Sequence, residues 1–289
     1  MKHFVFALIF SLFALASCDC SPATHFYPAG NSQTVATEGI RDGPRQGRRN
    51  ANQRLMSHVR ERTVLISVDC TPKDGVVILG TSNPNRYGDG WGSGIIVRST
   101  EGRSYIFTAA HVVEFSDKAN APHFNCVINI QREQDVGTEN NKVVASLVAK
   151  HTGRDVAVLR VPVDFGVNTE LELNPFTGED VWAVGFPMQK MSPSSKILSI
   201  TKGTLATVGV PASKKSFGQY HRVTSQVYFG NSGGGVWNKE GKLLSIVSAL
   251  FAGSGKVPYE GYYYTKPVGE VLHLLDKSLK YKEVFGDLN

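Results

Sequence analysis

The sequence has little of what marks a metal site, a nucleotide site or a disulfide-stapled domain. It contains four cysteines and eight histidines in 289 residues. Neither a Cys-x-x-Cys nor a His-x-x-x-His spacing occurs among them, so we expect no metal. A Gly-rich phosphate loop with Lys and a repeat of fixed period are also lacking, and we expect no cofactor. Hydrophobic residues make up 41% of the chain, enough to bury a core and to exclude wholesale disorder.

Long apolar runs are scarce as well, and the clearest one lies at the N-terminus. It extends from Phe4 to Ala16 after Lys2, which is short for a membrane span and typical of a secretory signal. We therefore assign residues 1–17 to a signal peptide. Residues 15–18 (LASC) resemble a bacterial lipobox, which implies lipid attachment at Cys18 and an exported domain on the periplasmic or extracellular side of a membrane. A plain secretory signal, cut near Ala16, is the alternative.

The basic excess of the chain is confined to a short stretch. The formal net charge is +6, but residues 41–62 hold seven Arg against Asp42 and Glu61, a net of +5. Residues 63–289 carry about +2, so we expect no nucleic-acid partner. Residues 18–62 lack an apolar pattern, and we interpret them as a flexible, Arg-rich tether. Its arginines would add attraction to an anionic membrane; a solvated arm without a specific partner is the alternative.

Short β-rich runs separated by Gly, Pro, Asn and Asp fill the chain from residue 63 onwards. Such spacing is typical of antiparallel barrels or sandwiches and predicts an all-β fold. Residues 266–279 are the exception, because their apolar side chains recur with helical spacing. The predicted strands are 63–68, 76–79, 94–98, 105–108, 126–130, 143–150, 156–160, 180–185, 196–208, 221–227, 234–237 and 243–249.

Three polar residues in this region form a set suited to acyl transfer. Ser232 lies in a Gly-rich turn (GNSGGG), His111 follows a predicted strand, and Asp155 opens an apolar one. They supply a nucleophile, a base and a carboxylate to orient the base. The amides of Gly230 and Ser232 are the natural donors to a developing oxyanion. Each residue alone has an ordinary explanation, such as a hairpin turn or a turn-forming Asp.

Taken together and in this order, the three segments resemble the chymotrypsin-like (trypsin-like) serine protease family. Residues 90–97 (GWGSGIIV) and 241–248 (GKLLSIVS) are similar to the family's strands before the histidine and after the serine. The resemblance implies two six-stranded antiparallel barrels with a C-terminal helix over residues 63–289. It also implies a catalytic site between the barrels, a protein or peptide substrate, and peptide-bond hydrolysis by a serine endopeptidase.

One departure from the animal digestive enzymes indicates a branch of the family. Asn231 stands where those enzymes have an Asp that pairs with a new N-terminal amine, and Gly-Asn-Ser-Gly-Gly is usual in the bacterial HtrA/Deg-like branch. That branch often carries PDZ domains after the protease. Only 57 residues follow Ser232, and the protease strands and helix account for them, so we expect no PDZ domain.

The same resemblance places a substrate pocket beside the serine. Its expected lining residues are Gln226, Val227, Ser248, Ala249 and Leu250. Because Gln226 is uncharged, we expect no preference for a basic residue before the scissile bond. Because Leu250 narrows the pocket, we expect a small or medium apolar residue there, such as Ala or Val.

The cysteines and the activity each leave two alternatives open. Cys18 is assigned to lipid with Cys20 beside it, so Cys70 and Cys126 either form a disulfide in an oxidising compartment or remain two buried thiols.

The alternative to an active protease is a catalytically inactive relative that serves as a binding lipoprotein, because a fold does not fix a function.

Overall fold

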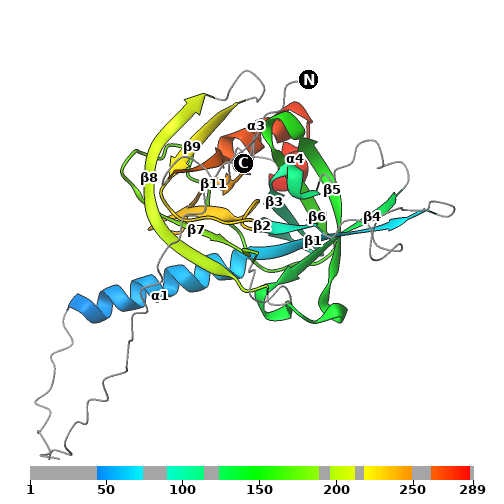
Figure 1. The fold of residues 1–289 in the computed structure, drawn as a ribbon, viewed down its shortest axis with the longest axis horizontal. Helices are drawn as coiled ribbons and strands as arrows, with labels where there is room; N and C mark the ends of the chain where they lie inside the picture. The colour runs from blue at the N-terminus through cyan, green and yellow to red at the C-terminus, as the bar shows by residue number, and fades with distance from the viewer. Residues whose placement is uncertain are drawn as a thin grey trace, which may run out of the picture. The chain divides into compact units, whose positions relative to one another are not determined.

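The computed structural model describes residues 44–73, 90–113, 124–188, 196–211, 218–248 and 262–286. Within these ranges, twelve strands form two closed barrels, with strand orders β1-β2-β3-β6-β5-β4 and β10-β11-β12-β9-β8-β7 (Figure 1). The paired strands are antiparallel, and α3 follows the last one. The predicted pair of six-stranded antiparallel barrels with a C-terminal helix is therefore confirmed.

The elements have the following bounds. The strands are β1 (Thr63–Pro72), β2 (Gly90–Thr100), β3 (Arg103–Thr108), β4 (Phe124–Arg132), β5 (Val143–His151), β6 (Val156–Val161), β7 (Asp180–Gly185), β8 (Ser199–Pro211), β9 (Gln219–Val223), β10 (Gly235–Asn238), β11 (Leu243–Val247) and β12 (Tyr263–Pro267). The helices are α1 (Pro44–Arg62), α2 (Ala110–Val113), α3 (Val268–Lys277) and α4 (Tyr281–Phe285), with 3-10 turns η2 (Glu133–Asp135), η3 (Glu139–Asn141) and η4 (Thr152–Arg154).

The alternation of side chains along the strands produces three apolar cores. In β1, Val64 and Ile66 lie in the interior cluster of the first barrel, whereas Leu65 between them belongs to a separate cluster. That separate cluster also holds Phe107 of the first barrel and Trp237 of the second, and a third cluster fills the second barrel. Successive strand residues point to opposite faces, so strands between the barrels are buried on both sides. This explains their nearly continuous apolar sequence.

The predicted helix starts two residues late in the structure because a strand comes before it. Residues Tyr263–Pro267 form β12, which pairs with β9 and β11, and α3 begins at Val268. The fixed φ of Pro267 suits the residue before a helix, and its missing N–H is not needed there. α3 then packs against β5 and β6 of the first barrel and against β11 of the second. It thus lies across both barrels.

The segment before the barrels differs from the flexible tether that we expected as far as Arg62. Residues Pro44–Arg62 form the helix α1, which runs directly into β1 (Figure 1). Leu55 and Val59, one helical turn apart, are 8% and 0% exposed and join the core cluster between the barrels. The burial of these two side chains orders a stretch that is otherwise polar. The flexible interpretation is therefore wrong for the C-terminal part of residues 18–62.

Polar contacts extend this packing to both barrels. His58 Nε2 lies 3.0 Å from the Gly241 carbonyl oxygen of the second barrel. Arg60 pairs with Glu133 beside the first barrel, and Arg62 donates to the carbonyl of Asn168 in the connection between the barrels. Two of the seven arginines of residues 41–62 are thus used in contacts within the fold. Of the helices in the described ranges, none is both long and apolar enough to cross a membrane.

The two domain cysteines lie opposite each other on neighbouring strands. The antiparallel register of β1 and β4 pairs Cys70 with Cys126, and a disulfide joins them. Of the two alternatives left open by the sequence, the structure therefore has the disulfide. Residues 1–17, Cys18, Cys20 and the predicted strand 76–79 lie outside the described residues.

Candidate active site

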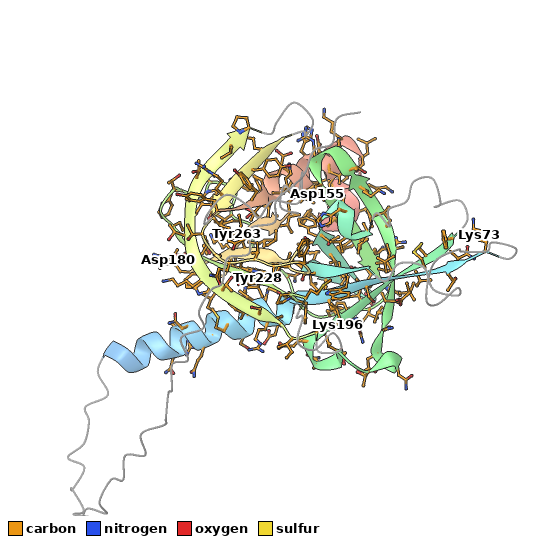
Figure 2. The ribbon with its side chains drawn as sticks, in the orientation of Figure 1. Lys73, Asp155, Asp180, Lys196, Tyr228 and Tyr263 are labelled. Atoms are coloured by element: carbon orange, nitrogen blue, oxygen red, sulfur yellow. A yellow bond between two sulfur atoms is a disulfide. The ribbon has the colours of Figure 1, made fainter. Side chains whose placement is uncertain are left out.

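Asp155 is presented by a tight turn at the start of β6. The 3-10 turn η4 begins after His151, whose Nδ1 accepts a hydrogen bond from the Arg154 amide, and Asp155 follows it with φ 55° and ψ 46°. This is the left-handed region, which L-residues with large side chains avoid and which short polar residues such as Asp tolerate. The turn places the carboxylate where the apolar strand begins, between the two barrels (Figure 2).

His111 binds this carboxylate with both its ring and its backbone. It lies on α2, directly after β3. Its Nδ1 is 2.9 Å and 3.0 Å from the two carboxylate oxygens of Asp155, and its amide donates to Oδ1 at 3.0 Å. A carboxylate accepts hydrogen bonds, so Nδ1 carries the ring proton and Nε2 keeps the lone pair. The two sequence-predicted residues of the first barrel are therefore brought together in the orientation that a general base requires.

Ser248 holds the same carboxylate from the second barrel. Its hydroxyl donates to Asp155 Oδ2 at 2.5 Å, directly after β11. Burial acts to raise the pKa of Asp155, but the hydrogen bonds from His111 and Ser248 outweigh it and hold the pKa below its ordinary value. The carboxylate is therefore ionised at neutral pH. Ser248 was expected in the substrate pocket, and the structure directs its side chain to Asp155.

The turn that carries Ser232 is held by a buried serine of the first barrel. The amide of Ser93 in β2 donates to the Ser232 carbonyl at 2.8 Å, and the Ser93 hydroxyl donates to the Gly230 carbonyl at 2.8 Å. The same hydroxyl accepts from the Phe186 amide at 2.8 Å. Ser93 thus fixes the residues on both sides of Asn231. This role of Ser93 was not predicted from the sequence, although a serine between two glycines in an apolar strand is a signal for it.

Close approach of the Ser232 turn to the His111 segment requires glycine. Gly233 has φ 82°, and a Cβ on it would lie 2.1 Å from the Ser93 carbonyl oxygen and 2.2 Å from Thr108 Oγ1, three residues before His111. A Cβ on Gly92 would meet the side chain of Val112 at 2.6 Å and the Ser232 carbonyl oxygen at 2.9 Å. The backbone of Ser232 and the residue after His111 therefore flank the same small space.

Two amides in the turn have no backbone acceptor. The amides of Asn231, Gly233 and Gly234 donate to the carbonyls of Tyr228, Val247 and Asn231. Those of Gly230 and Ser232 donate to no carbonyl within the described ranges. These are the two donors that the sequence predicted for an oxyanion.

Ser232 and His111 lie in neighbouring segments whose hydrogen bonds can be followed within the described residues. Among the contacts of the described residues, none joins the Ser232 hydroxyl to the His111 ring. Sites of this kind commonly tighten only when a substrate binds.

The predicted pocket residues are only partly seen. Gln226 is exposed, and its carbonyl accepts a hydrogen bond from Thr201 at 2.6 Å. Val227 is 3% exposed and packs in the core of the second barrel, and Ala249 and Leu250 lie outside the described residues. Next to them, Tyr228 and Phe229 are 56% and 70% exposed, so bulky apolar side chains border the serine turn.

Comparison with known proteins gives the family. A family model described as a trypsin-like peptidase domain matches residues 92–246. The chain is 28% identical over 198 residues to the serine protease Do-like HtrA of Bacillus subtilis, covering 66% of this chain and 39% of that protein. It is 28% identical over 192 residues to a probable periplasmic serine endoprotease DegP-like of Halomonas elongata, covering 64% of this chain and 34% of that protein. The chain spans about two fifths of the length of these curated relatives.

Solved structures agree on the fold. An HtrA-type protease with a tripeptide matches with a TM-score of 0.56 at 20% identity, covering 78% of this chain and 62% of that chain. The same type of protease with a decapeptide matches with a TM-score of 0.59 at 18% identity, covering 80% and 68%. The family model spans more than half of the chain and includes the segments of His111, Asp155 and Ser232. The chain therefore belongs to the trypsin-like peptidase family and is homologous to the HtrA/DegP serine proteases.

Proposed function

We propose that the protein is a serine endopeptidase in which Ser232 is the nucleophile, His111 the general base and Asp155 the residue that orients it. One observation carries the proposal. The partly buried Asp155 carboxylate is bound by His111 Nδ1 from the first barrel and by Ser248 from the second. Family membership supports the same reaction, because the named relatives are serine proteases.

The proposed first half of the reaction forms an acyl-enzyme. With Nδ1 of His111 committed to Asp155, Nε2 accepts the Ser232 proton as Oγ attacks the peptide carbonyl. The amides of Gly230 and Ser232, which have no carbonyl partner in the described ranges, stabilise the oxyanion. His111 then gives the proton to the leaving amine as the C–N bond breaks.

In the second half, water replaces the amine. His111 accepts a proton from the water as it attacks the acyl-enzyme, and returns that proton to Ser232 Oγ when the ester bond breaks. Asp155 stays ionised throughout, which agrees with the lowered pKa of its carboxyl group. The reaction consumes one peptide bond and one water and requires no cofactor.

Replacement of the nucleophile tests the proposal. We expect Ser232→Ala to lower the rate of cleavage of an unfolded protein substrate by about 10⁴–10⁶-fold without loss of fold. A fluorophosphonate should label wild-type Ser232 covalently and leave the variant unlabelled. Ser146→Ala, at an exposed position of β5, is the control and should keep the wild-type rate. A Ser232→Ala variant as fast as an active wild type would exclude Ser232 as the nucleophile. A wild type that neither cleaves the substrate nor reacts with the fluorophosphonate would favour the inactive binding protein.

For specificity, we propose a small or medium apolar residue before the scissile bond. The position six residues before Ser232 is the exposed, uncharged Gln226, which offers no carboxylate to a basic side chain. Digestion of a random peptide library, read by mass spectrometry, should show Ala and Val enriched at the substrate residue directly before the cleaved bond. Enrichment of Arg or Lys there would contradict the assignment.

For location, we propose that the protein is exported and held at a bacterial membrane by lipid on Cys18. The signal-like residues 1–17 and the LASC sequence support this, and the relative from Halomonas elongata is named periplasmic. Arginines of residues 41–54 would add attraction to an anionic surface. Arg60 and Arg62 contribute less than the sequence suggested, because their side chains contact Glu133 and Asn168.

A further inference from the structure

A fully buried lysine, which the proposed reaction does not use, lies behind Asp155. Lys266 in β12 is 0% exposed. Its Nζ lies 3.4 Å from the centroid of the Tyr220 ring in β9, where the aromatic face attracts a cation. Burial of an ammonium group is costly, so a lysine at this position calls for a reason other than packing.

The charged groups around Lys266 connect it to the catalytic turn. Glu270 of α3, Asp155 and Arg154 are close enough to interact electrostatically with its ammonium. Glu270 also forms an ion pair with Arg154 and accepts a hydrogen bond from the Gln219 amide at 2.8 Å. Lys266, Glu270 and Arg154 therefore form one charged cluster, and its last member is the residue directly before Asp155.

The strand register brings Lys266 to the same face as Ser248, the second contact of Asp155. Lys266 lies opposite Ile246 across the β11–β12 pair. Ser248, two residues beyond Ile246, donates its hydroxyl to Asp155. Residues two apart along a strand share a face. Lys266 and Ser248 thus approach the Asp155 turn from the same side of the second barrel.

We propose that Lys266 is a positioning residue, whose ammonium acts with Glu270 and Arg154 to hold the left-handed turn at Asp155 in the conformation that binds His111. The inference rests on the proposed peptidase function and deepens it. Asp tolerates the left-handed conformation at φ 55°, but the surroundings decide whether Asp155 keeps it, and this cluster supplies charged groups of those surroundings.

The ionisation of Lys266 supports a role in function rather than in stability. Burial lowers its pKa to about 8, Glu270 and Asp155 oppose that shift, and Arg154 adds to it. Because the folded-state pKa lies below the ordinary value of 10.5, the charged lysine destabilises the fold at neutral pH. Lys266 loses its charge as the pH rises through about 8, whereas Arg154 stays charged.

Three substitutions in the full chain test the inference by their pH profiles. The rate of fluorophosphonate labelling and kcat/KM are measured from about pH 6 to about pH 10, a range that spans the expected titration. In wild type, we expect both to fall as the pH rises through about 8. Lys266→Arg stays charged over the range and should lack that fall. Lys266→Met should be about tenfold slower at neutral pH, mainly in kcat, without an alkaline fall.

Stability and a surface lysine provide the controls. Lys266→Met should melt at the wild-type temperature or above it, since it removes a desolvated charge. Lys202→Met removes a lysine that pairs with Asp180 at the surface, and it should keep the wild-type profile.

Glu270→Gln is the third test substitution. It removes a carboxylate that raises the pKa of Lys266, so the alkaline fall should move to lower pH.

The outcomes separate this inference from the proposed function. A Lys266→Met variant with the wild-type rate and profile would overturn the positioning role. If that variant does not fold, an alkaline fall that persists in Lys266→Arg and stays in place in Glu270→Gln would overturn it equally. Failure of wild type itself to react with the fluorophosphonate would overturn the proposed function, and the positioning role with it.

Discussion

Ser93 connects the nucleophile turn to the opposite barrel through three hydrogen bonds. Its backbone holds Ser232, and its hydroxyl bridges the Gly230 carbonyl and the Phe186 amide. The residues that supply the proposed oxyanion donors are therefore positioned by a buried serine of the other barrel. Because an oxyanion site acts through fixed geometry, a small shift of the turn affects the transition state more than substrate binding.

We expect Ser93→Ala to lower kcat by about 10- to 100-fold with little change in KM. It should also cost about 1–3 kcal/mol of stability, because a buried amide and a buried carbonyl lose their partner. Steady-state kinetics and urea unfolding measure the two effects. Ser104→Ala is a matched control, since the buried Ser104 hydroxyl likewise donates to a carbonyl, of Val163, and accepts from an amide, of Phe165. It should lose similar stability and keep kcat; an equal loss of kcat in both variants would refute the assigned role of Ser93.

The candidate site could be predicted only as far as local motifs reach. His111 and Asp155 lie in short segments whose pattern identifies them, and the structure brings their side chains together. The contact of Ser248 with Asp155 and the cluster around Lys266 depend on how strands of the second barrel meet the first. That arrangement is set by packing between distant segments, which sequence spacing does not encode.

Among the helices, α1 is the element whose order depends most on tertiary contacts. Its sequence is largely polar, and helix propensity alone rarely stabilises such a segment in water. Leu55 and Val59 are buried between the barrels, while His58 contacts Gly241 and lies edge-on to Trp237. Leu55, Met56 and Val59 are the large apolar residues of this 19-residue helix, and three within five positions are too few to produce a helical pattern in the sequence. The element was missed because its partner surface is formed by residues almost two hundred positions away.

We expect Val59→Ala to destabilise the protein by about 1–3 kcal/mol, because the side chain is fully buried in the cluster between the barrels. Gln53→Ala, at an exposed position of the same helix, should change stability by less than about 0.5 kcal/mol. Chemical denaturation measures both. Equal stabilities of the two variants would mean that α1 contributes nothing to the fold, as the tether interpretation assumed.

The whole molecule was more predictable than its parts. Each barrel needs six strands with apolar faces, and such segments recur along the chain. The architecture can therefore be predicted even where the bounds of a single strand are wrong. The run 221–227, for example, ends as a strand at Val223. β12 was not predicted as a strand, and its last two residues fell in the predicted helix, yet neither error changed the architecture. The disulfide between Cys70 and Cys126 is also consistent with folding in an oxidising compartment.

Anchoring is a property of the whole chain and can be tested there. In a bacterial host that processes lipoproteins, we expect the wild-type protein in the membrane fraction and labelled by a fatty-acid analogue. Cys18→Ser should lose the label and move to the soluble envelope fraction, because the thiol that carries the lipid is gone. Cys20→Ser keeps the lipobox cysteine and is the control, with wild-type fractionation. Retention of the label in Cys18→Ser would contradict the anchor.

The division of the proposed site between two barrels also sets the order in which its residues are synthesised. His111 and Asp155 belong to a barrel whose last strand ends at Val161, whereas Ser232 and Ser248 come near the end of the chain. Domains emerging from a ribosome fold from the N-terminus. A nascent chain can therefore close its first barrel while the nucleophile and the second support of Asp155 are still missing. On the proposed mechanism, cleavage by a nascent chain would therefore begin only after the segment that carries Ser232 has been synthesised and folded.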